Sequence, residues 1–91
     1  MSEEKILTKH PQGKSGKNIS KDKYDVCKQA ILATLRGKEL TQREVFDALN
    51  RKLQGKFEEN ISWYCETVKL DLEARKTIER TSDQPQKYRL R

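Results

Sequence analysis

The sequence predicts an α+β, mainly helical fold in which three helices are followed by a C-terminal β-hairpin. Three observations predict it. Apolar residues recur at helical spacing up to residue 76, a helix-capping sequence begins at Thr41, and the spacing changes to alternation after residue 76. The chain has 91 residues, of which 33% are hydrophobic and 37% charged, a size that allows one small domain.

Residues 1–19 are predicted to form a flexible basic N-terminal arm ahead of the domain at 20–91. A short strand is possible at 5–8, where Ile, Leu and Thr favour extended structure. The stretch HPQGKSGKNIS that follows has neither a helical nor a strand period. Its Gly-Lys-Ser resembles the end of a P-loop, but Thr8 stands where that motif requires glycine, so a P-loop is excluded.

The first helix is predicted to begin near Ser20, whose hydroxyl can accept a hydrogen bond from a free amide of the first turn. It should end at Gly37. Four apolar residues fall within about 80° of arc at 100° per residue and predict the face that meets the core. They are Tyr24, Cys27, Ile31 and Leu35.

The second helix has the clearer start. Thr41 followed by Glu44 is a capping box, in which each side chain accepts a hydrogen bond from the other residue's backbone amide. Gly55 should end the helix. Its core-facing residues are predicted to be Val45, Ala48, Leu49 and Leu53.

The third helix, predicted from about Ser62 to Lys76, is apolar on two sides. One stripe holds Tyr64, Cys65, Val68 and Leu72, and a polar strip holds Glu66, Lys69, Glu73 and Lys76. The second stripe holds Trp63, Thr67, Leu70 and Ala74. Two interpretations stay open for it: either Trp63 packs onto the domain, or Trp63, Leu70 and Ala74 form an interface with a second copy or a protein partner.

The C-terminal residues predict a β-hairpin with strands at 77–80 and 87–91. Ile78, Tyr88 and Leu90 should face inward, and Leu40 with Thr41 can add a third short strand. The connection at 81–86 contains Pro85 and is too long for a two-residue turn, so it should project.

Several kinds of site are absent from the sequence. Cys27, Cys65 and His10 are too few for a zinc site, so no metal or cofactor is predicted and the cysteines are expected to be reduced core residues. No nucleophile lies beside a base and no carboxylate pair forms a known motif, which predicts a protein that is not an enzyme. There is no membrane-spanning run or signal peptide, so a cytoplasmic protein without a membrane partner is expected.

The net charge of +6 is distributed unevenly. Residues 1–23 hold six lysines against three acidic residues, and residues 77–91 hold four basic residues against two. Helix 62–76 has three of each and is neutral. Positive charge suits phosphates and needs no base-edge geometry. The arm and the hairpin could therefore follow a nucleic-acid backbone, although charge runs also serve as solvated tails and protect edge strands.

Three short helices followed by a hairpin, with Leu40–Thr41 as an extra strand, is an element order that resembles the winged helix-turn-helix superfamily over roughly 20–91. The stretch KFEENISWYCETVKLDLEARKTIER, leading to a YRL ending, is also similar to a group of short uncharacterised bacterial winged-helix proteins. The resemblance implies that helix 62–76 occupies the recognition position and that 81–86 is the tip of the wing. The acidic residues of helix 62–76 depart from the chemistry of base reading.

The resemblance and the charge together predict a protein that binds double-stranded DNA, such as a transcriptional regulator, through phosphates. The predicted contacts are Lys69 and Lys76 on helix 62–76, Arg80, Lys87, Arg89 and Arg91 on the wing, and Lys14 and Lys17 on the arm. The alternative is a protein-interaction or dimerisation module built on the same fold without DNA binding, because a fold does not determine a function.

Overall fold

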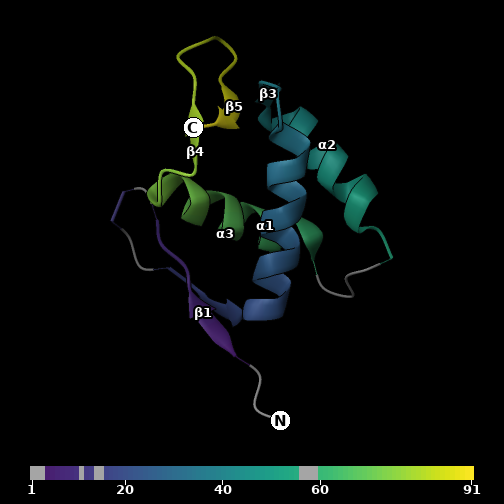
Figure 1. The fold of residues 1–91 in the computed structure, drawn as a ribbon, viewed down its shortest axis with the longest axis vertical. Helices are drawn as coiled ribbons and strands as arrows, with labels where there is room; N and C mark the ends of the chain where they lie inside the picture. The colour runs from purple at the N-terminus through teal and green to yellow at the C-terminus, as the bar shows by residue number, and fades with distance from the viewer. Residues whose placement is uncertain (1–3, 11, 14–15, 56–59) are drawn as a thin grey trace.

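The computed structural model describes residues 4–10, 12–13, 16–55 and 60–91. Within them, helices α1 (Lys21–Leu35), α2 (Gln42–Leu53) and α3 (Ile61–Ala74) pack on one another beside two small antiparallel sheets (Figure 1). The predicted α+β class, with three helices and a C-terminal hairpin, is confirmed. No helix in the described part of the chain combines the length and the apolar character needed to cross a membrane.

The core lies where the three helices meet, and the predicted apolar faces supply it. On α1 and α2 the stripes described above are buried, apart from Ala48, which is only partly buried. On α3 the first stripe faces inward, although Tyr64 at its edge is partly exposed. The fully enclosed apolar residues of the three helices are Cys27, Ile31, Leu35, Val45, Leu49, Leu53, Cys65, Val68 and Leu72.

The three helices begin within one or two residues of the predicted positions, but the side chains that cap them match the prediction only at α2. The capping box of α2 is confirmed: the Thr41 amide donates to Glu44 Oε1 at 2.9 Å, and the Glu44 amide donates to Thr41 Oγ1 at 3.3 Å. Ser20 precedes α1, but the prediction that its side chain caps the helix is wrong: its Oγ is buried with no partner among the described residues. Asn60 rather than Ser62 starts α3, because its Oδ1 accepts from the Trp63 amide at 3.0 Å.

The end of α3 comes two residues before the predicted Lys76. The Thr77 amide donates to the Leu72 carbonyl at 2.9 Å and the Lys76 amide to the Glu73 carbonyl at 3.0 Å. These two bonds form a Schellman motif, which places one residue in the left-handed region. That residue is Lys76, with a φ of 64°.

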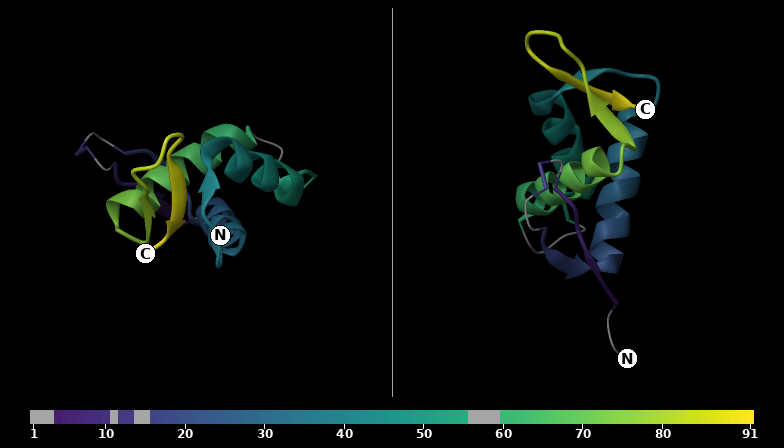
Figure 2. Two further views of the ribbon diagram at one scale, coloured as in Figure 1. Left: turned by 90° about the horizontal axis from the view of Figure 1, so that it is seen from above. Right: turned by 90° about the vertical axis from the view of Figure 1, so that its left-hand side faces the viewer.

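The C-terminal sheet forms as the sequence predicts. Its strands are β3 (Leu40–Thr41), β4 (Ile78–Arg80) and β5 (Lys87–Leu90), in the order β3-β5-β4. Tyr88 in the central strand lies opposite both Leu40 and Arg80. Ile78 and Tyr88 are buried and Leu90 is partly buried, so the inward face is confirmed. The β4–β5 connection projects beyond the helices (Figure 1, Figure 2).

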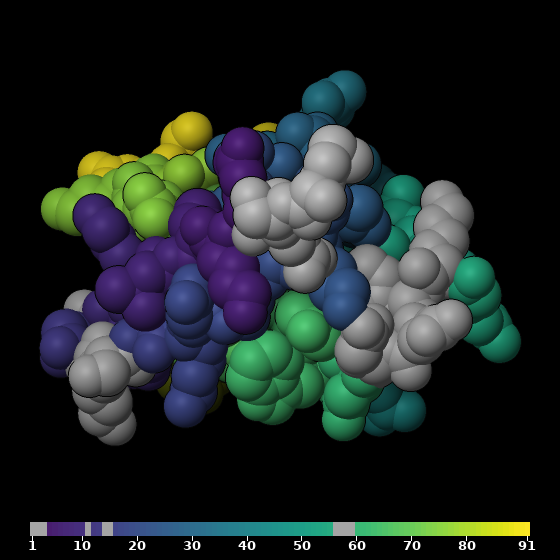
Figure 3. Space-filling view, turned by 90° about the horizontal axis from the view of Figure 1, so that it is seen from below, coloured from purple at the N-terminus to yellow at the C-terminus, as the bar shows by residue number. Residues whose placement is uncertain are grey.

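The N-terminal segment differs from the predicted free arm. Strands β1 (Lys5–Leu7) and β2 (Asn18–Ser20) pair antiparallel, with Ile6 opposite Ile19. Thr8 and Ile19 are buried, and the described residues of this hairpin lie against α1 and α3 (Figure 3). The possible strand at 5–8 is present as β1, whereas β2 and the pairing of the two strands were not predicted, because a strand of three residues is too short to show an alternating pattern.

A glycine makes this hairpin possible. A Cβ built on Gly16 would lie 1.6 Å from the carbonyl oxygen of Thr8, a separation no side chain can occupy. The close approach allows the Thr8 amide to donate to the Lys17 carbonyl at 2.9 Å and the Lys17 amide to donate to Thr8 Oγ1 at 2.8 Å. Gly16 is therefore a structural requirement of the hairpin.

Candidate functional site

The outward face of α3 gathers the three residues that the sequence proposed for a partner interface. Trp63 is 43% exposed, and Leu70 and Ala74 are partly exposed. Their spacing, with Thr67 between them, places them on one side of the helix, opposite the core residues Val68 and Leu72. The second apolar stripe therefore does not pack into the core. Its residues Trp63, Thr67, Leu70 and Ala74 form a ridge on the surface of α3, called the α3 ridge below.

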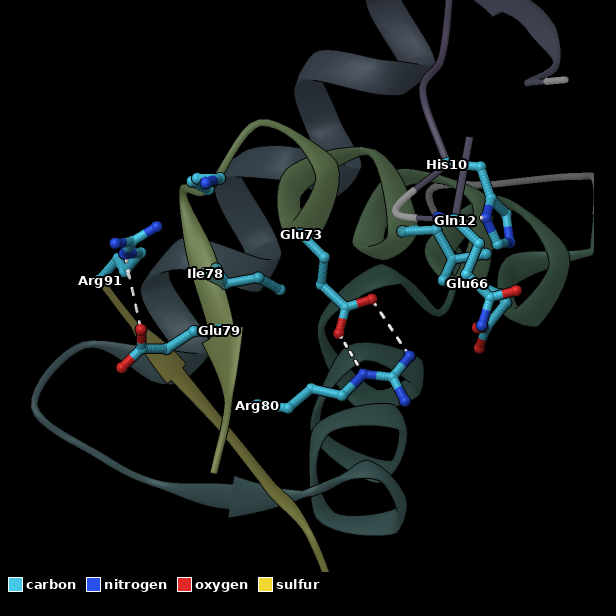
Figure 4. Close-up of a pocket in the computed structure, with 10 residues that line it drawn as sticks. His10, Gln12, Glu66, Glu73, Ile78, Glu79, Arg80 and Arg91 are labelled. Carbon is cyan, nitrogen blue, oxygen red and sulfur yellow. Dashed lines mark hydrogen bonds and ion pairs between the residues drawn. The ribbon is translucent and has the colours of Figure 1, made fainter. Parts of the chain in front are cut away.

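A groove of about 560 Å³ lies beside this ridge (Figure 4). The N-terminal segment contributes His10 and Gln12 to it, α3 contributes Glu66, Leu70 and Glu73, and the C-terminal residues contribute the rest. Most of its charges are neutralised in place. Arg80 donates to both carboxylate oxygens of Glu73 at 2.5 and 3.2 Å, and Arg91 lies 3.5 Å from Glu79. A groove lined in this way offers little net charge to a phosphate.

Lys69 is an interior residue, and the prediction that it contacts DNA is corrected on that ground. Its side chain is 1% exposed. Its Nζ donates to the Tyr88 hydroxyl at 2.9 Å and to Gln42 Oε1 at 3.3 Å, and it lies 3.4 Å from Glu66 Oε1. Burial of a lysine is tolerated because these partners replace its water. Lys69 thus joins α3 to α2 and to the C-terminal sheet, and cannot reach a ligand outside the protein.

Asp71 on α3 is completely buried. As Lys69 joins α3 to the C-terminal sheet, Asp71 joins α3 to the N-terminal segment. Its carboxylate accepts from the Tyr24 hydroxyl, from the Lys9 backbone amide at 2.8 Å and from Arg75 Nε at 2.9 Å. Burial, followed by the hydrogen bond to Asp71, raises the pKa of Tyr24. The two charged residues Lys69 and Asp71 therefore bind the C-terminal sheet and the N-terminal hairpin to α3 from opposite sides.

The arginines proposed for the wing are engaged within the protein. Arg89 lies 2.8 Å from Glu39 and 2.7 Å from Glu79, and its pKa is raised mainly by the hydrogen bond to Glu39. Arg80 and Arg91 form the pairs described above with Glu73 and Glu79. These side chains remain about half exposed, so their guanidinium groups are accessible but partly neutralised.

Three of the other lysines proposed as DNA contacts differ from these arginines in having no acidic partner among the described residues. Lys17 and Lys76 are exposed and Lys87 is half-buried, and none of the three forms an ion pair with an acidic residue in the described part of the chain. Lys14 lies outside the described residues. The cations available to an external phosphate therefore come from separate elements rather than from α3.

The two thiols are core groups, as predicted. Cys27 on α1 and Cys65 on α3 are free and fully buried. A hydrogen bond between the two thiols, followed by burial, raises the pKa of Cys27 above its ordinary value. A buried thiol of this kind is protected from reagents in solvent.

Periodicity and charge counts do not predict the partners of Asp71. The spacing of Tyr24 predicts only that it belongs to the core, and a charge count treats Asp71 and Arg75 as single charges. A signal was present: Asp71 and Arg75 have the i, i+4 spacing of a helical ion pair, and the pair forms with Nε 2.9 Å from Oδ2. Nothing in the sequence connects Asp71 to the Lys9 amide.

In a comparison with known protein families, the model of the family of unknown function DUF6958 matches residues 5–88. The match includes the N-terminal hairpin as well as the helices and most of the C-terminal sheet. The comparisons with curated proteins and with solved structures found no match.

Proposed function

Because the chain belongs to the DUF6958 family, whose function is unknown, we propose a function from its own surface: a protein-interaction module on a winged-helix scaffold. The order α1-β3-α2-α3-β4-β5 and the sheet order β3-β5-β4 support that scaffold. In a winged helix, the third helix is the one that DNA-binding members use for reading, and α3 is the third helix of this chain. What α3 exposes therefore decides between a DNA-binding and a protein-binding role.

One observation carries the proposal. Along α3 the outward ridge presents Trp63, Leu70 and Ala74, while the only lysine of the helix is buried. Base reading requires Arg, Lys, Asn or Gln side chains directed at base edges, and carboxylates are repelled by phosphates. Exposed tryptophan beside aliphatic residues is instead typical of protein-binding surfaces. The α3 ridge is therefore better suited to a protein than to a DNA groove.

Site-specific photocrosslinking in the native cell tests this role. A photoreactive phenylalanine derivative is placed at Trp63 or Leu70, and at Gln29 on α1 as the matched exposed control. We expect a discrete protein adduct from the α3 positions that is missing from the Gln29 variant. Adducts that are equal at all three positions, or no protein adduct from α3, would overturn the proposal.

A second candidate function, binding of duplex DNA through phosphates alone, is favoured by the net charge of +6. Lys17, Lys76 and Lys87 would be its contributors, since their charges are not neutralised by described acidic residues. Such binding would be independent of sequence, because it involves no contacts with base edges.

Titration with random-sequence duplex at two salt concentrations tests the second candidate. Binding in the micromolar range that weakens steeply with salt, and that weakens further when Lys17, Lys76 and Lys87 are changed to Glu, would support it. Charge reversal is preferable to truncation, because removing the N-terminal segment would also remove the buried Thr8 and Ile19. Absence of binding at low salt would exclude this function.

A further inference from the structure

A second groove lies at the N-terminal end of the α3 ridge, between the first turns of α2 and α3. Its volume is about 720 Å³, within the roughly 300–1,000 Å³ range of cavities that hold small ligands. A groove of this size can hold a few side chains of a peptide. The residues that line it are Gln42, Arg43, Phe46, Asn60, Ser62, Trp63 and Glu66.

Two aromatic rings give this groove an apolar floor. Phe46 packs against the core and remains partly exposed, and Trp63 is 43% exposed. The Trp63 ring meets Tyr64 edge-on, with centroids 5.0 Å apart and planes at 83°, which restricts its orientation. An exposed, oriented tryptophan beside a second ring can bury a large apolar side chain from a partner.

The uncompensated charge in the groove is positive. Arg43 is exposed and forms no ion pair with an acidic residue among those that the structure describes. The one carboxylate of the lining, Glu66, lies 3.4 Å from the buried Lys69 ammonium. A guanidinium without an internal partner is suited to paired hydrogen bonds with a carboxylate. The groove thus combines an apolar floor with a site for one acidic group.

We propose that this groove binds a short acidic segment of a partner protein. A large apolar side chain of that segment packs on Trp63 and Phe46, while a neighbouring carboxylate pairs with Arg43. The net charge of +6 favours approach of an acidic partner. This inference rests on the proposed protein-binding role and names the chemical class of the partner.

The test measures binding of the full chain to a pool of short fluorescent peptides, each with a central Trp or Leu among Asp and Glu residues. Control pools replace the acidic residues by Lys, or the central residue by Ala. Arg43→Glu is compared with Arg51→Glu, an exposed arginine of the same helix. We expect Arg43→Glu and Trp63→Ala each to weaken binding about tenfold or more, and Arg51→Glu to change it less than about threefold. Thermal unfolding of each variant confirms that it folds.

Failure to bind any acidic peptide, or equal losses for Arg43→Glu and Arg51→Glu, overturns the inference. Loss of duplex DNA binding in Arg43→Glu, with no peptide binding in the native protein, assigns the groove to phosphate and also overturns it. The crosslinking experiment separates this failure from failure of the proposed function. Protein adducts at Trp63 or Leu70 with no acidic-peptide binding would leave the protein-binding role intact and reject only this partner class.

Discussion

The Nζ of Lys69 donates a hydrogen bond to the Tyr88 hydroxyl at 2.9 Å and lies 4.3 Å from the centre of the same ring. The tyrosine hydroxyl in turn donates to Gln42 Oε1 at 3.2 Å. Three elements that are distant in the chain, α2, α3 and β5, therefore meet at one buried ammonium group. The single lysine of α3 is therefore used to hold the three elements together.

Replacing Lys69 by Ala should lower the free energy of unfolding by about 2–4 kcal/mol, because it leaves a cavity and removes the donor to the buried Tyr88 hydroxyl. Lys52→Ala, at an exposed position of α2, should change it by less than about 0.5 kcal/mol. Urea unfolding of the two variants measures both values. Equal, small effects would mean that the Lys69 side chain lies in solvent.

Asp71→Asn should loosen the N-terminal hairpin. The amide carries no charge and cannot accept all the hydrogen bonds that the carboxylate takes from Tyr24, Arg75 and the Lys9 amide. We expect a loss of roughly 2–4 kcal/mol in unfolding free energy and faster hydrogen exchange at the Thr8 amide.

Asp25→Asn is the control for Asp71→Asn. Asp25 pairs with Lys21 at 2.9 Å, but both side chains are about half exposed, so its loss should cost less than about 1 kcal/mol. Unchanged exchange at Thr8 in Asp71→Asn would show that the hairpin is anchored elsewhere.

Lys76→Gly should stabilise the protein by about 0.5–1 kcal/mol. Lys76 occupies the left-handed position of the Schellman motif, where a Cβ is unfavourable and glycine is preferred. Lys76→Ala removes the same charge but keeps the Cβ, so it should give no such gain. Thermal and urea unfolding of the pair separate the two effects. A glycine variant no more stable than the alanine variant would contradict the left-handed conformation.

Glu44 should contribute to the acid dependence of stability. The Thr41 backbone amide donates to its carboxylate and the Thr41 hydroxyl adds to the effect, so the pKa of Glu44 is lowered. A carboxylate with a lowered folded-state pKa stabilises the protein above its unfolded pKa of roughly 4.3, and the contribution disappears as pH falls through the folded value.

The measurement is the stability difference between the native protein and Glu44→Gln as a function of pH. The difference should be largest near neutral pH, should shrink as the pH falls below roughly 4.3, and should be lost once the pH has passed below the folded-state pKa of Glu44. Asp47→Asn, on the same helix but outside the capping box, supplies the background. A difference that stays constant with pH would rule out the lowered pKa.

The sequence predicted best where local patterns determine structure. The stripe Tyr24–Leu35 and the Thr41–Glu44 capping box each depend only on residue types at short fixed spacings, so both can be predicted without any tertiary contact. The alternation in 87–91 predicted the C-terminal strand for the same reason. The spacing of apolar residues along the chain was therefore enough to predict the fold class and most of the core residues.

Prediction failed where a distant partner determines the role of a residue. Lys69 has the spacing of a polar surface strip, and only its contacts with Gln42 and Tyr88, 27 and 19 residues away, make it an interior residue. The N-terminal segment is joined to α3 by the hydrogen bond from the Lys9 amide to Asp71, a contact that nothing in the sequence indicates. Of the candidate site, Trp63 and Leu70 were predicted from their stripe, but Arg43 was not, because its groove exists only where α2 meets α3.

The anchor of the N-terminal hairpin also has a consequence for synthesis of the chain. The Lys9 amide and the Asp71 carboxylate are separated by 62 residues. A ribosome that adds about 5–20 residues per second needs about 3–12 s to make that stretch, so the first strands emerge long before their anchor exists. Strands β1 and β2 therefore leave the ribosome without the residue that holds them against α3, and until it emerges Ile6 and Ile19 are available to a chaperone.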